Sequence, residues 1–327
     1  MNFSILLTGA SGFVGGHLAE ALVRRKQKVK LLVRSSSQLA FPATPLIQLC
    51  PGDVTDPESL QKAMVGVETV YHLAGVLRGP NFANYEWVNA QGTRNVCEAL
   101  AQQKKGKRLV YVSSLSAAGP SEINRPLTEE MPAHPVSFYG QTKFMGEEIV
   151  RSYQKKLKTV ILRPAAVYGP REKDILEYFK MVKQGWVFIP GDGAQKVSFV
   201  HVFDLVEAIL LAGKSPKASG ETFFVSDGKS YTFEEFSGVI AGALGKSFHT
   251  LHIPISLVKV VAAVADIIGR IRGKAIILSS DKIKEAVVPG WVCDNRKLVR
   301  KLGFKPKYDI EKGVRNSVEF YLKAGWI

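Results

Sequence analysis

The stretch Phe3-Ser4-Ile5-Leu6-Leu7-Thr8-Gly9-Ala10-Ser11-Gly12-Phe13-Val14-Gly15 decides the fold. Its apolar beginning predicts a buried β-strand, and its glycines fall where an amphipathic helix through about Arg25 begins. Glycines at a strand-to-helix turn permit a tight bend, and the free N–H groups at a helix N-terminus attract a diphosphate. The loop therefore predicts a dinucleotide site, to which we assign Thr8, Gly9, Ser11, Gly12, Phe13, Val14 and Gly15.

Four more short apolar runs follow, at 29–33, 67–73, 109–112 and 160–162, with amphipathic helical stretches between them. Strands that alternate with helices predict right-handed crossovers and a parallel sheet with helices on both faces. We therefore expect a doubly wound α/β fold of the Rossmann type, with a smaller, mostly helical C-terminal lobe. The dinucleotide-binding domain would span 1–170, with 197–226 returning to it, and the substrate lobe would comprise 171–196 and 227–327.

Composition limits the classes of protein that fit. The chain has 327 residues, and 44 lysines and arginines against 29 acidic residues give it a net charge of +15. Its 22% charged and 46% hydrophobic residues are typical of a folded globular protein, which excludes disordered, collagen-like and coiled-coil chains. The basic residues form short groups late in helical patterns and no nucleic-acid motif accompanies them, so we expect no nucleic-acid partner.

Cysteine usage and the N-terminus bear on the compartment. Cys50, Cys97 and Cys293 are odd in number and form no CxxC pair, which favours a reducing environment. The first residues lack the basic stretch and long apolar core of a signal peptide. We therefore expect a cytoplasmic protein, and because the histidines show no ligand spacing we expect no metal.

One apolar stretch, 251–271, raises the question of a membrane. Lys259 and Asp266 interrupt it, so we expect no spanning helix. The stretch predicts an ordinary buried helix of the smaller lobe or, taken over 251–274 with its flanking basic residues, a peripheral membrane contact.

The end of the second predicted strand bears on the cofactor. Arg34 stands there with three serines after it, where an NAD-preferring fold usually has an acidic residue against the adenosine ribose. A guanidinium with hydroxyls beside it suits a 2′-phosphate. We therefore expect NADP, with NAD as the second choice.

Tyr139 and Lys143 are the candidate catalytic pair. They lie four residues apart on a predicted helix, which places the phenol and the ammonium on one face. A nearby Lys⁺ favours the ionised phenol, which could then exchange a proton with a substrate oxygen. Tyr308 and Lys312 have the same spacing, but only Tyr139 follows a strand that ends in Ser113-Ser114, at the sheet edge where ligands bind.

Together these motifs resemble those of the extended short-chain dehydrogenase/reductases, the superfamily that also contains nucleotide-sugar epimerases and dehydratases. The resemblance covers nearly the whole chain. Its other matching segments are Asp53-Val54, His72-Leu73-Ala74-Gly75, Asn89 with Gly92-Thr93, Arg163-Pro164, Tyr168-Gly169-Pro170, Phe199-Val200-His201-Val202 and Asp204.

The resemblance implies a role for each matching residue. Tyr139 would be the acid-base, and Lys143 would hold the nicotinamide ribose and tune Tyr139. Ser114, with Ser113 as the neighbouring alternative, would hydrogen-bond the substrate oxygen. The remaining cofactor residues would be Asp53 and Val54 at the adenine, Leu73, Ala74 and Gly75 at the middle of the cofactor, and Pro164 and Val167 at the nicotinamide. Asn89, supporting the active-site region, and Tyr168, flanking the nicotinamide, join Ser114 as candidate substrate residues.

Two departures from the family pattern bear on the reaction. The serine strand is followed by Leu115-Ser116-Ala117-Ala118 instead of the acidic pair of the dehydratases, which disfavours dehydration. Epimerases usually carry an Asn and an Arg toward the nucleotide diphosphate, and those slots hold Ala166 and Val197 here. Lys196 or Arg171 could replace the missing charge.

What remains resembles the dihydroflavonol-reductase-like and 3β-hydroxysteroid-dehydrogenase-like branches. We expect an NAD(P)-dependent oxidoreductase that transfers hydride between the cofactor and the carbonyl or alcohol of an apolar or aromatic small molecule. Phe138, Tyr168, Trp186 and Phe188 agree with an apolar pocket. The alternatives are a nucleotide-sugar epimerase that retains its cofactor and a non-catalytic NADP-binding regulator. The resemblance also implies a homodimer through a helix bundle that includes the helix of Tyr139.

Overall fold

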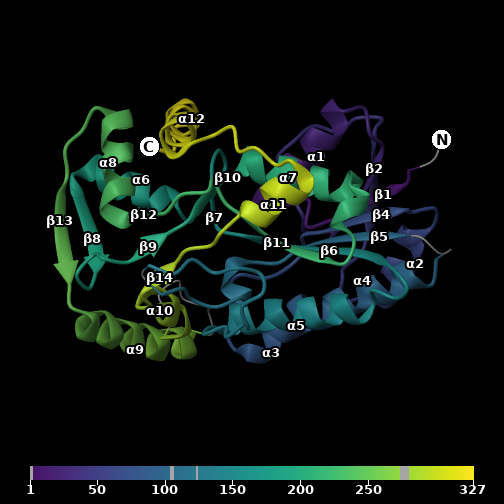
Figure 1. Cartoon of the computed structure of the whole chain (residues 1–327), viewed down its shortest axis with the longest axis horizontal. Coiled ribbons are helices and arrows are strands. Elements are labelled where there is room, and N and C mark those ends of the chain that lie inside the picture. Colours follow the sequence, from purple (N-terminus) through teal and green to yellow (C-terminus); the bar gives the residue numbers. More distant parts are fainter. Residues whose placement is uncertain (1–2, 104–106, 123, 273–279) are drawn as a thin grey trace.

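The computed structural model describes residues 3–103, 107–122, 124–272 and 280–327 (Figure 1). Its centre is a seven-stranded sheet in which all neighbouring strands are parallel. In spatial order the strands are β11 (Glu221–Val225), β6 (Lys158–Pro164), β5 (Arg108–Val112), β4 (Thr69–His72), β1 (Ile5–Thr8), β2 (Val29–Val33) and β3 (Ile47–Pro51). The strand order reverses between β1 and β4, and such switch points hold ligands in doubly wound sheets. The predicted fold is confirmed.

The five apolar runs of the sequence all lie in this sheet, whereas β3 has no such run. It is one of the two edge strands of the sheet, and its side chains at Gln48 and Leu49 are exposed. An edge strand needs no continuous apolar pattern because one side of it faces solvent.

Helices cover both faces of the sheet, as Figure 1 shows. One face packs on α1 (Phe13–Arg24), α7 (Val202–Lys214) and α11 (Arg296–Leu302), and the other on α2 (Pro57–Met64), α4 (Gly92–Ala101) and α5 (Phe138–Ser152). Leu18, Leu22 and Leu205 belong to the first of these two cores, and Leu60, Val96 and Val150 to the second; all six are fully or almost fully buried.

A second assembly of elements lies beside the carboxyl ends of the strands. It contains α6 (Leu176–Gln184), β8 (Trp186–Pro190), β9 (Lys196–Val197), β12 (Tyr231–Thr232), α8 (Phe233–Leu244), β13 (His249–Ile253), β14 (Gly290–Trp291) and α12 (Ile310–Lys323). Its core is aromatic: Phe236 stacks on Phe199 and makes edge contacts with Tyr168 and Phe179. Between this core and the main sheet, β7 (Ala166–Tyr168) pairs with β10 (Phe199–His201), after which α7 and β11 return the chain to the sheet.

Two helices form the lower edge of this lobe in Figure 1, α9 (Ile255–Arg272) and α10 (Ser280–Ala286). The apolar stretch over 251–274 corresponds to the end of β13 and to α9, and its residues 273 and 274 lie outside the described residues. Among the described residues, no helix combines the length and the hydropathy needed to cross a membrane. The remaining helical segment, α3 (Phe82–Glu86), leads into a π-helical turn at Trp87–Gln91.

Candidate active site

The glycine loop closes against the neighbouring strand end. Gly9 adopts a φ of +79°, and a Cβ atom there would lie 2.7 Å from the backbone nitrogen of Ala74. A Cβ atom on Gly15 would lie 2.0 Å from the carbonyl oxygen of Gly9. Helix α1 begins at Gly12 without a side-chain cap, so its first N–H groups remain available to a ligand. The loop therefore has the close approach and the open helix terminus that a diphosphate requires.

A buried chain of hydrogen bonds ties this loop to the rest of the site. The Thr8 hydroxyl lies 2.7 Å from Nδ1 of His72, and Nε2 of His72 lies 3.0 Å from the Thr93 hydroxyl, which donates to the Asn89 carbonyl. Since the Thr93 hydroxyl donates its hydrogen bond to the Asn89 carbonyl, its oxygen accepts from Nε2–H of His72. Burial accordingly holds the imidazole neutral and lowers the pKa of His72 to about 3.

Asn89 is a supporting residue in this structure. It is fully buried in the π-helical turn. Its Oδ1 accepts from the Val76 N–H at 2.8 Å, and its Nδ2 donates to the Val76 carbonyl and to the Thr142 hydroxyl on α5. The side chain thereby fixes the segment after β4 to the helix that carries Tyr139. Asn89 is not among the residues that line the cavities described next.

Three connected cavities run along the carboxyl ends of the strands. The inner cavity, of about 270 Å³, holds the candidate adenosine residues, including Arg34, Asp53 and Val54. The middle cavity, of about 350 Å³, shares Gly9, Gly12, Leu73 and Gly75 with it. All of the predicted cofactor residues line one or both of these two cavities. Together the two have the extended shape that a dinucleotide needs.

Arg34 lies at the outer side of the inner cavity, next to Ser37. The Arg34 N–H donates to the Ser37 hydroxyl, and Nε of Arg34 is 3.9 Å from a carboxylate oxygen of Asp53. Because the Arg34 side chain is 66% exposed, this pair is screened by solvent and leaves the guanidinium accessible.

Tyr139 and Lys143 stand on α5 at the middle cavity, opposite Ser113 and Ser114 at the end of β5. Burial raises the pKa of the Tyr139 phenol well above its ordinary value, the hydrogen-bonded Ser114 hydroxyl opposes the rise, and the charge of Glu285 adds to it. Our expectation that Lys143 favours the ionised phenol is therefore not met in this structure. The phenol is held neutral, which suits a proton donor.

Lys143 is itself buried, and its ammonium points toward the strand. Its Nζ donates to the Val112 carbonyl at 2.8 Å and lies over the ring of Tyr111. Burial lowers the pKa of Lys143 to about 7, and the Glu147 carboxylate opposes the shift. The lysine is thus more easily neutralised than an exposed one.

Glu147 fixes helix α5, which carries Tyr139 and Lys143, to the sheet. It lies one turn beyond Lys143, is fully buried, and accepts from both Nε and Nη2 of Arg163 on β6 at 2.8 and 2.7 Å. The Ser113 hydroxyl donates to the same carboxylate at 2.6 Å, and Arg151 adds a further ion pair. A buried carboxylate with this many charge-assisted partners fixes the position of α5 relative to β5 and β6.

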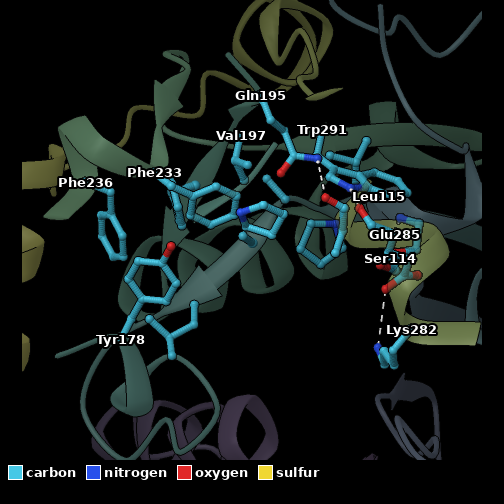
Figure 2. Close-up of a pocket in the computed structure, with 18 of the residues that line it drawn as sticks. Ser114, Leu115, Tyr178, Gln195, Val197, Phe233, Phe236, Lys282, Glu285 and Trp291 are labelled. Carbon is cyan, nitrogen blue, oxygen red and sulfur yellow. Dashed lines mark hydrogen bonds and ion pairs between the residues drawn. The ribbon is translucent and has the colours of Figure 1, made fainter. Parts of the chain in front are cut away.

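The outer cavity, of about 530 Å³, begins where the middle one ends, and both are lined by Ser114, Pro164 and Ala165. Figure 2 shows its two ends. Tyr178, Phe233 and Phe236 lie together at one end, and Ser114, Lys282 and Glu285 lie at the other. A molecule in this cavity would therefore meet polar groups beside the catalytic helix and aromatic rings farther away.

Helix α10 brings residues to the site that the sequence analysis missed. Asp281 accepts from the Phe138 N–H at 3.0 Å, at the start of α5, and Glu285 accepts from the Ser137 hydroxyl at 2.5 Å. Lys282 pairs with Glu285 at 3.3 Å and lies over the ring of Tyr139. No spacing in the sequence links residues 281–285 to residues 137–139, so only the tertiary structure reveals this contact.

The structure also corrects the list of aromatic residues expected in the pocket. Phe188 lines the outer cavity. Tyr168 does not line any of the three cavities: it is 1% exposed and packs against Phe199 and Phe236, because β7 turns its ring into the aromatic core. Phe138 packs on Phe82 and Tyr85, and Trp186 is exposed beside His249.

A glycine loop on the first strand and a Tyr-x-x-x-Lys helix beside a serine strand, both at one edge of a doubly wound sheet, define a short-chain dehydrogenase/reductase of the extended type. In agreement, residues 5–226 match the model of the NAD dependent epimerase/dehydratase family, and the chain belongs to this family.

The relatives include both epimerases and dehydrogenases. An N-acetyl-α-D-glucosaminyl-diphospho-ditrans,octacis-undecaprenol 4-epimerase of Escherichia coli O157:H7 is 30% identical over 98% of this chain and 96% of its own length. Short-chain dehydrogenase/reductase family 42E member 1 of Danio rerio is 31% identical over 95% of this chain and 87% of its own length. The solved structure of UDP-glucose 4-epimerase of Thermotoga maritima with UDP-glucose superposes with a TM-score of 0.80 at 24% identity, over 99% of both chains.

Proposed function

We propose that the chain is an NAD(P)-dependent oxidoreductase acting on the carbonyl or alcohol of a largely apolar molecule. One observation carries the proposal. The outer cavity joins the catalytic residues at Ser114 and is otherwise lined mainly by apolar and aromatic side chains. Such a cavity stabilises an apolar substrate body by burial and leaves one polar end at the reacting oxygen.

The outer cavity is poorly equipped for a nucleotide diphosphate. Ala166 and Val197, which occupy the slots where epimerases usually have an Asn and an Arg, both line it. Lys282 is the one cation among the described residues that line it, and Glu285 pairs with that cation. Arg171 is bound to Glu20 and His17 near α1 instead. Burying a diphosphate without charge-assisted partners costs on the order of several kcal/mol of binding free energy.

The residues present fit a dinucleotide in the inner and middle cavities, where the positive φ of Gly9 and the uncapped start of α1 form the cradle. When bound, the dinucleotide supplies or accepts the hydride. Tyr139 then donates its phenolic proton to the carbonyl oxygen as the alcohol forms, and takes it back in the reverse direction. Ser114 would hold that oxygen by a hydrogen bond, and Lys143 would orient the neighbouring ribose of the dinucleotide.

We further propose NADP as the preferred dinucleotide. The accessible Arg34 guanidinium beside Ser37 supports a 2′-phosphate. The nearby Asp53 carboxylate opposes it in part, since its Oδ2 is 3.9 Å from Nε of Arg34.

The test of the reaction is the replacement Tyr139→Phe. Loss of the proton donor should lower turnover by at least about 10²-fold while dinucleotide affinity stays nearly unchanged. The measurement is nicotinamide absorbance with a panel of apolar ketones, together with calorimetric titration of the cofactor. Tyr308→Phe is the matched control, because that tyrosine has the same spacing to a lysine but does not line the three cavities. A Tyr139→Phe protein with full activity would exclude the acid-base role.

An epimerase that retains its cofactor is the second candidate, favoured by the 30% identity with the undecaprenol-linked epimerase. The two functions differ in stoichiometry. A reductase consumes the reduced dinucleotide in proportion to substrate, whereas an epimerase interconverts sugars with no net change in nicotinamide absorbance. The same absorbance assay, run with nucleotide sugars and lipid-linked sugars and followed by product analysis, separates them.

A further inference from the structure

Exposed apolar side chains gather at one edge of the C-terminal lobe. Trp186 and Phe188 on β8, Leu251 on β13 and a set of residues on α9 are all exposed. Strand β13 leads directly into α9 through Pro254, and Figure 1 shows both at the rim of the molecule, away from the main sheet. Exposed apolar side chains that gather in one patch are typical of an interaction site.

On α9 the exposed residues form a stripe. Leu257, Val260, Val261 and Val264 are 50%, 59%, 47% and 51% exposed. Their spacing of three and four residues puts them on one face of the helix. Ala262 is buried, and α9 packs chiefly against α10, so the exposed stripe is a second apolar face that the described residues do not cover.

A side cavity connects this edge to the active site. It has a volume of about 200 Å³, and Ile255, the first residue of α9, lines it. It shares Pro190, Gln195 and Ala286 with the outer cavity. Phe188 is both exposed to solvent and a lining residue of the outer cavity. An apolar molecule that reaches the α9 edge therefore has a short, mostly apolar way to Ser114.

The charge around the stripe favours an anionic surface. Residues 183–190 and 246–272, which carry the exposed apolar side chains and include all of α9, contain five basic residues, Lys183, Lys246, Lys259, Arg270 and Arg272, and one acidic residue, Asp266. The whole chain adds a net charge of +15. Lysines next to an apolar helix face are typical of helices that lie in the headgroup region of anionic bilayers.

We propose that the stripe Leu257, Val260, Val261 and Val264 docks the protein on an anionic lipid bilayer, with α9 lying in the headgroup region, and that the substrate is an amphipathic lipid which enters the outer cavity from this edge. The docking surface stands on its own observations, and the substrate class rests on the proposed oxidoreductase function. No helix has to span the bilayer for this arrangement.

The test is flotation of the purified protein with vesicles of phosphatidylcholine mixed with phosphatidylglycerol, and with vesicles of phosphatidylcholine alone. The double variant V260E/V264E should lower partitioning onto the anionic vesicles by at least about tenfold, since two apolar contacts are lost and two negative charges are added. The matched control is V65E/L322E, which changes the charge equally at positions that are 66% and 54% exposed elsewhere. Partitioning of this control should stay close to that of the unchanged protein.

Three results would overturn the docking surface: no flotation with the anionic vesicles, an equal loss for both double variants, or a sedimentation experiment in which V260E/V264E converts a dimer to a monomer without any vesicle binding. The last outcome would assign the stripe to a second copy of the chain.

A turnover assay separates the surface from the reaction. Tyr139→Phe should float like the unchanged protein, and V260E/V264E should keep its turnover of a water-soluble ketone while losing turnover of a ketolipid embedded in the vesicles. If the stripe binds vesicles but no carbonyl compound is reduced, the surface stands and the proposed function fails. If both ketones are turned over equally by V260E/V264E, entry of substrate from the bilayer is excluded.

Discussion

The dinucleotide half and the C-terminal lobe are built on different principles. In the first, backbone geometry decides the structure: Gly9, which follows β1, has a positive φ, and a Cβ atom on Gly15 would collide with a carbonyl oxygen. In the second, side chains decide: aromatic rings around Phe236 fill the core, and glycines such as Gly238 and Gly242 on α8 face open space. Backbone constraints leave a signature at fixed positions, whereas aromatic packing can be achieved by many sequences.

The largest expected effect comes from replacing one glycine in each half, Gly15 in the loop and Gly242 on α8. Gly15→Ala should weaken dinucleotide binding by at least about tenfold, because the new methyl group forces the loop away from α1. Gly242→Ala should raise the free energy of unfolding by about 0.5–1 kcal/mol, because a helix interior prefers alanine. Calorimetric titration and urea unfolding measure the two effects. Equal behaviour of the two variants would show that the glycines of the loop have no special geometric role.

Buried histidines in both halves should make the stability of the protein depend on pH. Burial lowers the pKa of His72 and His201 to about 3 and that of His17 to about 4. Between pH 6.5 and about 4 each histidine is neutral in the folded protein and takes up a proton on unfolding. Stability should therefore fall as the pH falls, by up to about 1.4 kcal/mol per pH unit for each.

Urea unfolding at several pH values measures this slope. His72→Gln in the dinucleotide half and His201→Gln beside the C-terminal lobe should each reduce the slope by up to about 1.4 kcal/mol per pH unit, the contribution of one proton taken up on unfolding. An unchanged slope in either variant would show that the histidine in question is protonated in the folded state.

Cofactor selectivity is expected to be a smaller effect and confined to the first half. Arg34→Asp should weaken NADP binding by about tenfold or more while NAD binding changes much less, because only the 2′-phosphate needs the guanidinium. Calorimetric titration with both dinucleotides gives the ratio. Equal losses for NADP and NAD would remove the argument for a 2′-phosphate site.

The smallest expected effect concerns the contact between α10 and α5, where the two halves meet. Asp281→Ala should cost about 1 kcal/mol of stability, because its carboxylate accepts from the first N–H of α5, and Asp56→Ala should cost about as much at the start of α2. Only Asp281→Ala should also raise KM for the carbonyl substrate, since it moves α10 at the outer cavity. A KM raised by both variants would point to general destabilisation.

The sequence was sufficient for the sheet, the glycine loop and the placement of Ser114, Tyr139 and Lys143 around one cavity, because each depends on local spacing or on strand order. It was not sufficient for Glu285 and Lys282, which reach the site only through the docking of α10 on α5, nor for Tyr168, whose motif position gave no indication that its ring enters the aromatic core. The burial of the Lys143 ammonium was not indicated either, since spacing does not reveal how deeply a side chain is buried.

The π-helical turn at Trp87–Gln91 makes the length of this segment as important as its composition. A π-turn contains one residue more than an α-turn, so deleting a single residue from it would restore the α-helical hydrogen bonds and leave α4 in nearly the same orientation relative to α3. The deletion would remove or displace Asn89, however, and would break its hydrogen bonds to Val76 and Thr142. In this stretch the protein should tolerate the substitution of an exposed side chain such as that of Trp87 more easily than the deletion of a residue.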